Sequence, residues 1–221
     1  LYFTVSGYLM YRDAVQGMSL SDKVAEIQSN DSYTTLEELP EMYLRAVVAV
    51  EDHRFYKHNG IDIIAIGRAL WTDIKAMSFV EGGSTITQQL AKNMYFTQDK
   101  DIRRKVAEVF MAFHIEKNYE KDEILELYVN TIYFGNGYYC IRDASEGYFG
   151  KLPKDMTDYE STLLAGIPNA PSVYAFTNNP QLANERQRQV LNKMISHGKL
   201  TEAEAEKITG SNEQSKLSEI K

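Results

Sequence analysis

Two blocks of sequence, between residues 51 and 93, decide the fold and the chemistry of this chain. The first reads Glu51-Asp52-His53-Arg54-Phe55-Tyr56-Lys57-His58-Asn59-Gly60. The second reads Gly82-Gly83-Ser84-Thr85-Ile86-Thr87-Gln88-Gln89-Leu90-Ala91-Lys92-Asn93. In the first block two adjacent carboxylates follow an apolar run, Ala46-Val47-Val48-Ala49-Val50. A carboxylate at the edge of a core is partly desolvated, which raises its proton affinity, so Glu51 is predicted to act as a base.

The second block predicts a glycine turn, a Ser/Thr helix cap and a short helix. Backbone N–H groups at a helix start attract anions, and glycines let a phosphate approach the main chain. Side chains spaced by three and four share one helix face, and this face offers Thr85, Gln88, Gln89 and Lys92. The block therefore predicts an anion-binding cradle that ends in a cation.

Both blocks resemble the first two motifs of the peptidoglycan glycosyltransferases of the bacterial cell wall. That family includes the polymerase domain of bifunctional penicillin-binding proteins and the monofunctional wall transglycosylases. Further along, Arg104-Lys105-x-x-Glu108 resembles the third motif, which lines the catalytic cleft. From spacing alone these three side chains would be a surface ion-pair cluster. Segments 121–150 and 163–174 resemble the fourth and fifth motifs, so the resemblance covers roughly residues 36–207.

The resemblance implies a lysozyme-like helical large lobe, a small membrane-facing lobe and a cleft between them. The implied substrate is lipid II, a disaccharide-pentapeptide on undecaprenyl diphosphate, which an inverting transfer adds to a growing glycan chain. Glu51 is the expected base, and Glu108 is expected to organise the donor diphosphate. The implied substrate-binding residues are Asp52, Phe55, His58, Gly83, Ser84, Thr85, Gln88, Gln89, Lys92, Asn93, Lys100, Arg104 and Lys105.

The resemblance also implies ligands and shows two departures. A divalent cation, Mg or Mn, is a candidate cofactor at Glu108 and Asp52, no organic cofactor is expected, and moenomycin is an expected inhibitor. Cys140 stands where the family usually has glycine, which puts the local backbone packing in doubt. Lys100 stands where arginine is frequent, and lysine keeps the charge but loses the bidentate fork.

The composition of the chain limits the classes of protein and of binding partner that remain possible. A chain of 221 residues fits one large domain, or one domain with a small lobe, and 43% hydrophobic residues suffice for a core. The net charge of −7 argues against a nucleic-acid partner. The single cysteine excludes an internal disulfide and a cysteine-cluster metal site. The sequence does not set the oligomeric state.

Helix caps recur and strand signals are weak, so a mainly α fold is predicted. Segment 19–35 is expected to be extended or irregular, and helices are expected to begin at Pro40, Asp62, Asp101, Asp122, Thr157, Asn179 and Thr201. Trp71 is expected to pack beside the apolar stripe of its helix. The helix over 102–119 is expected to bury Val106, Val109, Phe110 and Phe113, and to turn Arg104, Lys105 and Glu108 the other way.

The predicted domains are a membrane-proximal stub and linker over 1–35, a glycosyltransferase domain over 36–209 with a small lobe at about 76–105, and a disordered tail over 210–221. The apolar segment 1–11 is shorter than the roughly 20 residues that span a bilayer, but its tyrosines are typical of a membrane interface. We expect the end of an anchor whose transmembrane helix lies upstream, with the domain on the extracytoplasmic face of the bacterial membrane. A buried first helix or strand is the alternative.

Apolar residues also flank the cradle, namely Met77, Phe79, Val80, Met94, Tyr95 and Phe96. They fit either a lobe that dips into a bilayer or an ordinary core. For the whole chain two other functions stay open. One is a muramidase-like hydrolase or lytic transglycosylase that uses Glu51 as an acid, and the other is a non-catalytic wall-precursor-binding module. The cations Lys92, Lys100, Arg104 and Lys105 argue against the hydrolase, because a neutral glycan leaving group needs none.

Overall fold

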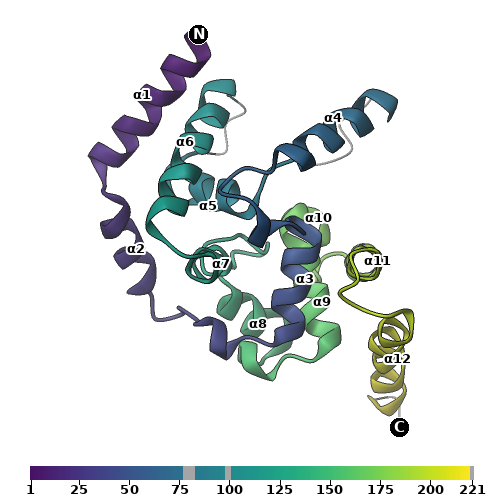
Figure 1. The fold of residues 1–221 in the computed structure, drawn as a ribbon. Helices are drawn as coiled ribbons and strands as arrows, with labels where there is room; N and C mark the ends of the chain where they lie inside the picture. The colour runs from purple at the N-terminus through teal and green to yellow at the C-terminus, as the bar shows by residue number, and fades with distance from the viewer. Residues whose placement is uncertain (77–82, 98–100, 220–221) are drawn as a thin grey trace. The chain divides into compact units, whose positions relative to one another are not determined.

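A computed structural model describes residues 1–76, 83–97 and 101–219 of the chain. All regular secondary structure in these ranges is helical (Figure 1). The predicted mainly α class is therefore confirmed. The chain divides into two compact units. Unit 1 comprises Leu1–Asp31 and Arg54–Thr131, and unit 2 comprises Ser32–His53 and Ile132–Lys221.

Unit 1 is built around one long helix. Its helices are α1 (Tyr2–Gly17), α2 (Leu20–Gln28), the short 3-10 helix η2 (Phe55–Lys57), α4 (Ile63–Ala76), α5 (Ile86–Tyr95), α6 (Ile102–Asn118) and α7 (Lys121–Val129). Helix α6 packs against α1, α5 and α7. The residues that α6 buries are Ala107, Glu108, Met111, Ala112 and Ile115, so this helix contributes to the core of the unit.

The contact between α1 and α6 depends on a glycine. A Cβ atom on Gly7 would lie 2.6 Å from the Cβ of Val106, so a larger residue would push the two helices apart. Beside this contact the ring of Tyr8 packs edge-on against Phe110, with centroids 5.3 Å apart. The hydroxyl of Tyr11 and Nδ1 of His114 lie 3.1 Å apart and share a hydrogen bond. Segment 1–11 is thus part of a helix that is docked along one side.

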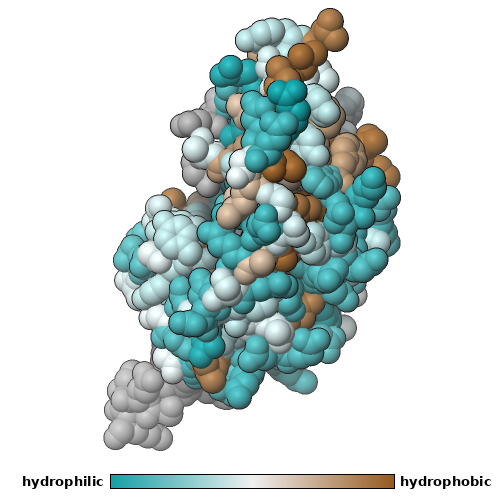
Figure 2. Space-filling model, turned by 90° about the vertical axis from the view of Figure 1, so that its left-hand side faces the viewer, coloured by the Kyte–Doolittle hydropathy of each residue, from teal (hydrophilic) through white to brown (hydrophobic). Residues whose placement is uncertain are grey.

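Much of the apolar surface of α1 is exposed. Figure 2 shows hydrophobic surface gathered toward the N-terminal end of this helix. The exposed side chains are Leu1, Tyr2, Phe3, Val5, Tyr8 and Leu9. Among the described residues, however, no helix combines the length and the hydropathy that crossing a bilayer requires.

Unit 2 has its core where three helices pack on one another. Its helices are η1 (Leu36–Glu38), α3 (Glu41–Glu51), α8 (Ile141–Phe149), η3 (Pro153–Asp155), α9 (Asp158–Gly166), η4 (Ile167–Asn169), α10 (Pro171–Tyr174), α11 (Pro180–Ser196) and α12 (Glu202–Glu219). Helices α3, α9 and α11 contact one another in pairs. The buried apolar run of α3, from Ala46 to Val50, lies in this core. Its burial fixes the helix at whose end Glu51 lies.

Several predicted helix caps are confirmed because capping is a local interaction. The Asp101 carboxylate accepts from the Arg103 backbone N–H at 2.7 Å and begins α6. Thr157 and Thr201 cap α9 and α12 in the same way, each with a glutamate three residues later. Helix α7 differs from the prediction: its cap is Glu120, which forms a capping box with Glu123, and Asp122 lies inside the helix.

The structure contradicts three predictions in unit 1. Segment 19–35 was expected to be extended or irregular, yet Ser19 caps α2 and the helix buries Leu20 and Val24. Trp71 was expected to pack within its helix stripe, yet it is 62% exposed. The predicted buried face of α6 is also wrong, because the buried residues are Ala107, Glu108, Met111, Ala112 and Ile115. Two neighbouring helices cover different sides of α6, and the periodicity of one sequence does not reveal them.

The predictions for the C-terminal segment and for Cys140 can also be compared with the structure. Helix α12 continues to Glu219, whereas a disordered tail was expected from Gly210. The departure Cys140 caps α8, because its sulfur accepts from the Asp143 backbone N–H at 3.4 Å. Burial raises the pKa of this thiol to about 11, so it stays protonated and unreactive at neutral pH.

The predicted domain boundaries remain a prediction, and Lys100, Gly82 and segment 77–80 lie outside the described residues.

Candidate functional site

The cradle, which we define as Gly83, Ser84 and Thr85, leads directly into α5. Thr85 is the helix cap: its hydroxyl oxygen accepts from the Gln88 N–H at 3.1 Å, and the Gln88 side chain accepts from the Thr85 N–H at 3.0 Å. The Thr85 hydroxyl also donates to the Gly60 carbonyl at 2.6 Å. Thr85 and Gln88 are therefore buried parts of a capping box. Of the three cradle residues, only Gly83 and Ser84 are partly exposed.

Gly60 explains how this cap reaches the preceding loop. Its φ is +84°, a left-handed conformation that favours glycine. A Cβ at this position would also lie 3.2 Å from the Ala112 backbone of α6. The glycine in the first block thus lets the loop approach α6 closely and present a carbonyl to the cap of α5. The two motifs of the sequence are joined at this hydrogen bond.

Glu108 is the most buried charged group of the site, with 1% of its surface exposed. One of its carboxylate oxygens accepts from Arg104 Nη1, and the other accepts from Lys105 Nζ at 2.8 Å. The Lys105 ammonium also donates to the Ser84 hydroxyl at 2.7 Å. We call Arg104, Lys105 and Glu108 the charge cluster. It contains two cations and one carboxylate, and it holds one of the cations at the cradle.

The divalent cation expected at Glu108 does not fit this arrangement. Each oxygen of the Glu108 carboxylate already accepts a charge-assisted hydrogen bond from a cation of the same helix. A metal ion at this carboxylate would be repelled by both Arg104 and Lys105, which already neutralise its charge. We therefore derive no chemical step through a metal at Glu108.

The helix of the cradle contains the remaining predicted contacts. Gln89 is partly exposed, and its side-chain oxygen accepts from the Tyr128 hydroxyl at 3.4 Å. Lys92 and Asn93 are also partly exposed, one turn further along α5. Met94, one of the apolar residues that flank the cradle, is buried and belongs to the core of unit 1. Tyr95 and Phe96 are only partly buried.

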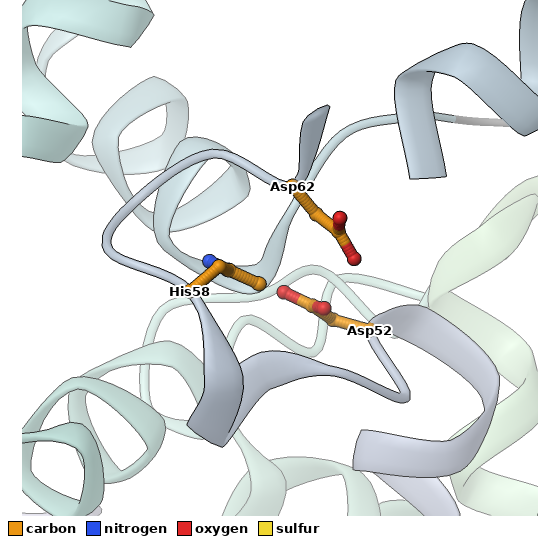
Figure 3. A group of neighbouring side chains, drawn as sticks. All are labelled: Asp52, His58 and Asp62. Carbon is orange, nitrogen blue, oxygen red and sulfur yellow. The ribbon is translucent and has the colours of Figure 1, made fainter. Parts of the chain in front are cut away.

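The loop after the first motif is held by an aspartate. The Asp62 carboxylate accepts from the backbone N–H groups of Ile64 and Ala65, each at 3.0 Å, and from Arg54 Nε at 2.9 Å. Burial by itself raises the pKa of Asp62, but the hydrogen bond from Ala65 and the positive charge of Arg54 lower the pKa below its usual value overall. Figure 3 shows Asp62 and His58 on this loop. Asp62 therefore serves as the predicted cap of α4.

Phe55 is a core residue of unit 1. It has no exposed surface, and the Lys121 ammonium lies 4.4 Å from the centre of its ring. Its other neighbour in the motif, His58, lies edge-on with ring centroids 6.4 Å apart. Packing and orientation in the cleft were the roles predicted for Phe55 and His58, and these roles remain a prediction.

The sequence interpretation missed one network that supports α5. The Thr87 hydroxyl donates to Glu116 Oε1 at 2.6 Å, and Lys121 Nζ donates to the same oxygen at 2.7 Å. The network links α5, α6 and the start of α7, so it helps to fix the helix of the cradle. Thr87 lies within the second motif, but its partner Glu116 has no sequence signal of its own.

In unit 2, Glu51 is the last residue of α3 and is partly exposed, as its place at the end of an apolar run predicted. Asp52 follows as the C-cap, only 7% exposed, and its backbone N–H donates to the Val48 carbonyl at 3.1 Å. Tyr43 lies on the same helix. Burial and the nearby charge of Glu51 raise the pKa of its hydroxyl well above the usual range. Glu51 thus lies between the core of unit 2 and solvent.

Comparison with known proteins agrees with the motifs. The Transglycosylase family matches residues 19–195. Penicillin-binding protein 1F of Bacillus subtilis is 46% identical over 185 residues, which cover 83% of this chain and 26% of the relative. Penicillin-binding protein 1A of Aquifex aeolicus is 41% identical over 169 residues, which cover 76% of this chain and 23% of the relative. The chain therefore spans about a quarter of the length of these curated relatives.

The family match covers most of the chain. The chain therefore belongs to the Transglycosylase family. This is the peptidoglycan glycosyltransferase class that the first two motifs indicated.

Proposed function

We propose that this chain polymerises lipid II into glycan strands and releases undecaprenyl diphosphate. The observation that supports it best is the charge cluster: a buried glutamate holds Lys105 at the Ser84 hydroxyl of the cradle. A diphosphate leaving group needs cations and hydrogen-bond donors as negative charge develops on it. A hydrolase that releases a neutral glycan has no such need.

In the proposed reaction the acceptor sugar hydroxyl attacks the anomeric carbon of the donor. The Glu51 carboxylate takes the proton of that hydroxyl as the new carbon–oxygen bond forms. The bond between the anomeric carbon and the diphosphate oxygen breaks on the opposite face, and the diphosphate leaves with the bonding electron pair. Lys105 and Arg104 stabilise its charge, with Lys92 as a further cation on α5. Configuration at the anomeric carbon is therefore inverted.

We propose that unit 1 meets the membrane. The support is its exposed apolar surface, which comprises the outer side of α1 together with Ile63, Ile64 and Trp71 of α4. The net charge of −7 opposes binding to anionic lipid, so insertion of apolar side chains has to supply the affinity. Changing Phe3, Ile64 and Trp71 to Ser should release the protein from liposomes. Unchanged co-sedimentation with liposomes would contradict this proposal.

The activity is tested by offering the protein two substrates separately, labelled lipid II and purified glycan strands. The proposal expects longer glycan from lipid II, with inhibition by moenomycin, and no cleavage of the purified strands. Cleavage of the strands would favour the muramidase-like alternative. Binding of lipid II with no product at all would favour the non-catalytic module.

A further inference from the structure

We propose that His197 is a positioning residue for Glu51, because it fixes the end of α3 through a ring stack with His53. This inference rests on the proposed role of Glu51 as the base. It concerns only unit 2, in which α3 and α11 pack directly against each other.

The stack joins the two ends of these helices. The imidazole rings of His53 and His197 lie 4.1 Å apart between centroids, with an angle of 10° between their planes. His197 is the C-cap of α11, and His53 lies two residues after Glu51, where the chain leaves α3. Both side chains are partly exposed. Ring nitrogen lone pairs lie in the ring plane, so two rings stacked face to face do not point them at a shared metal ion.

A second contact from α11 lies one turn earlier. Lys193 Nζ donates to the Val50 carbonyl at 3.3 Å. The last carbonyls of a helix lack partners within the helix, so this bond satisfies one of them at the end of α3. Lys193 and His197 are spaced by four and lie on the same side of α11. They contact Val50 and His53, the residues on either side of the Glu51-Asp52 pair.

This arrangement affects the rate rather than the binding of substrate. The backbone on each side of the two carboxylates is attached to a helix in the core of unit 2. A base must lie within hydrogen-bond reach of the proton that it takes, and small displacements of a reacting group can lower the rate strongly. Neither His53 nor His197 has to touch the substrate for this effect.

The test uses four variants of the whole chain: His197→Ala, His197→Phe, Glu51→Gln and the control Asn192→Ala. Asn192 is exposed on the same helix and makes neither contact. Two quantities are measured, the steady-state kinetics of lipid II polymerisation and the hydrogen exchange of backbone amides in residues 46–56. His197→Phe keeps a flat ring for the stack and removes the imidazole nitrogens.

For His197→Ala we expect kcat to fall about ten-fold with KM nearly unchanged, since only the placement of the base is altered. Exchange at residues 51–54 should become faster. His197→Phe should restore both readouts, and Asn192→Ala should match the wild type. If His197→Ala lowers the melting temperature enough to obscure these effects, His53→Ala with the same readouts takes its place.

Wild-type kcat and exchange in His197→Ala would overturn the proposal. Equal losses in His197→Ala and His197→Phe would overturn it as well, because the ring stack would then not be the cause. Glu51→Gln separates this result from the proposed function. If Glu51→Gln polymerises lipid II normally, the role of the base is wrong, whereas the exchange data still report whether the stack fixes the end of α3.

Discussion

The two glutamates that the motifs single out lie in opposite environments. Glu108 of unit 1 is 1% exposed, and both of its oxygens accept from cations on its own helix. Glu51 of unit 2 is partly exposed and ends a helix whose preceding residues are apolar and buried. One of the two cations that hold Glu108, Lys105, also donates to the Ser84 hydroxyl of the cradle. In the proposed function, therefore, Glu108 organises charge and Glu51 transfers the proton.

The largest predicted effect on the rate concerns Glu51. Glu51→Gln keeps the size and the hydrogen-bonding groups of the side chain but removes the proton acceptor. We expect kcat for lipid II polymerisation to fall about 100-fold or more, from the usual contribution of a general base. Steady-state assays on the purified variant measure this. Activity within a few-fold of the wild type would show that the base lies elsewhere.

A smaller effect is predicted for the cation that the charge cluster holds at the cradle. Lys105→Met removes the ammonium and keeps the length of the side chain. Affinity for a diphosphate-lipid analogue should fall about ten-fold, the usual contribution of a hydrogen bond to a charged group. The remaining affinity should depend less on salt. Lys117→Met, an exposed lysine on the same helix, is the matched control. Equal affinities of the two variants in a calorimetric titration would show that Lys105 does not bind the diphosphate.

The smallest predicted effect is on stability and comes from the cap of α4. Asp62 has a lowered pKa in the folded protein, so its charge stabilises the fold above the unfolded pKa, and this contribution is lost as the pH falls through the folded pKa. Asp62→Asn keeps a capping side chain but loses the charge that faces Arg54. We expect a loss of about 1 kcal/mol in the free energy of unfolding at pH 7.

At pH 3 the difference between Asp62→Asn and the wild type should be smaller, because this pH lies below the unfolded pKa of an aspartate and part of the stabilisation by the charge is already lost. Denaturant titrations at both pH values measure it, with Asp13→Asn, an exposed aspartate of α1, as the control. A difference that stays constant between pH 7 and pH 3 would mean that the charge of Asp62 contributes nothing.

The sequence predicted best what depends on near neighbours along the chain. The caps at Asp62, Asp101, Thr157 and Thr201 are set by side chains two or three residues away, and the structure confirms all four. The family and the mainly α class are confirmed for a related reason, because long motifs and repeated caps are local patterns. The cap at Ser19 is an equally local pattern, but the polar composition of segment 19–35 favoured a non-helical prediction there.

Faces of helices were predicted less well, because packing partners distant in sequence decide them. Phe113 was expected in the core and is exposed, whereas Glu108 was expected on the opposite side and is buried. The reason is that α1 and α5 both pack on α6, and neither contact follows from the periodicity of α6. The stack of His53 on His197 is another such contact, between residues far apart in the chain.

The division of roles between Glu108 and Glu51 is tested most directly by one calorimetric titration. A diphosphate-lipid analogue is titrated into Glu51→Gln and into Glu108→Gln, at a temperature where both variants are folded. We predict that Glu51→Gln binds the analogue with wild-type affinity, and that Glu108→Gln binds it about ten-fold more weakly because Lys105 is no longer held at the cradle. Wild-type affinity in Glu108→Gln, together with weakened binding in Glu51→Gln, would contradict this division.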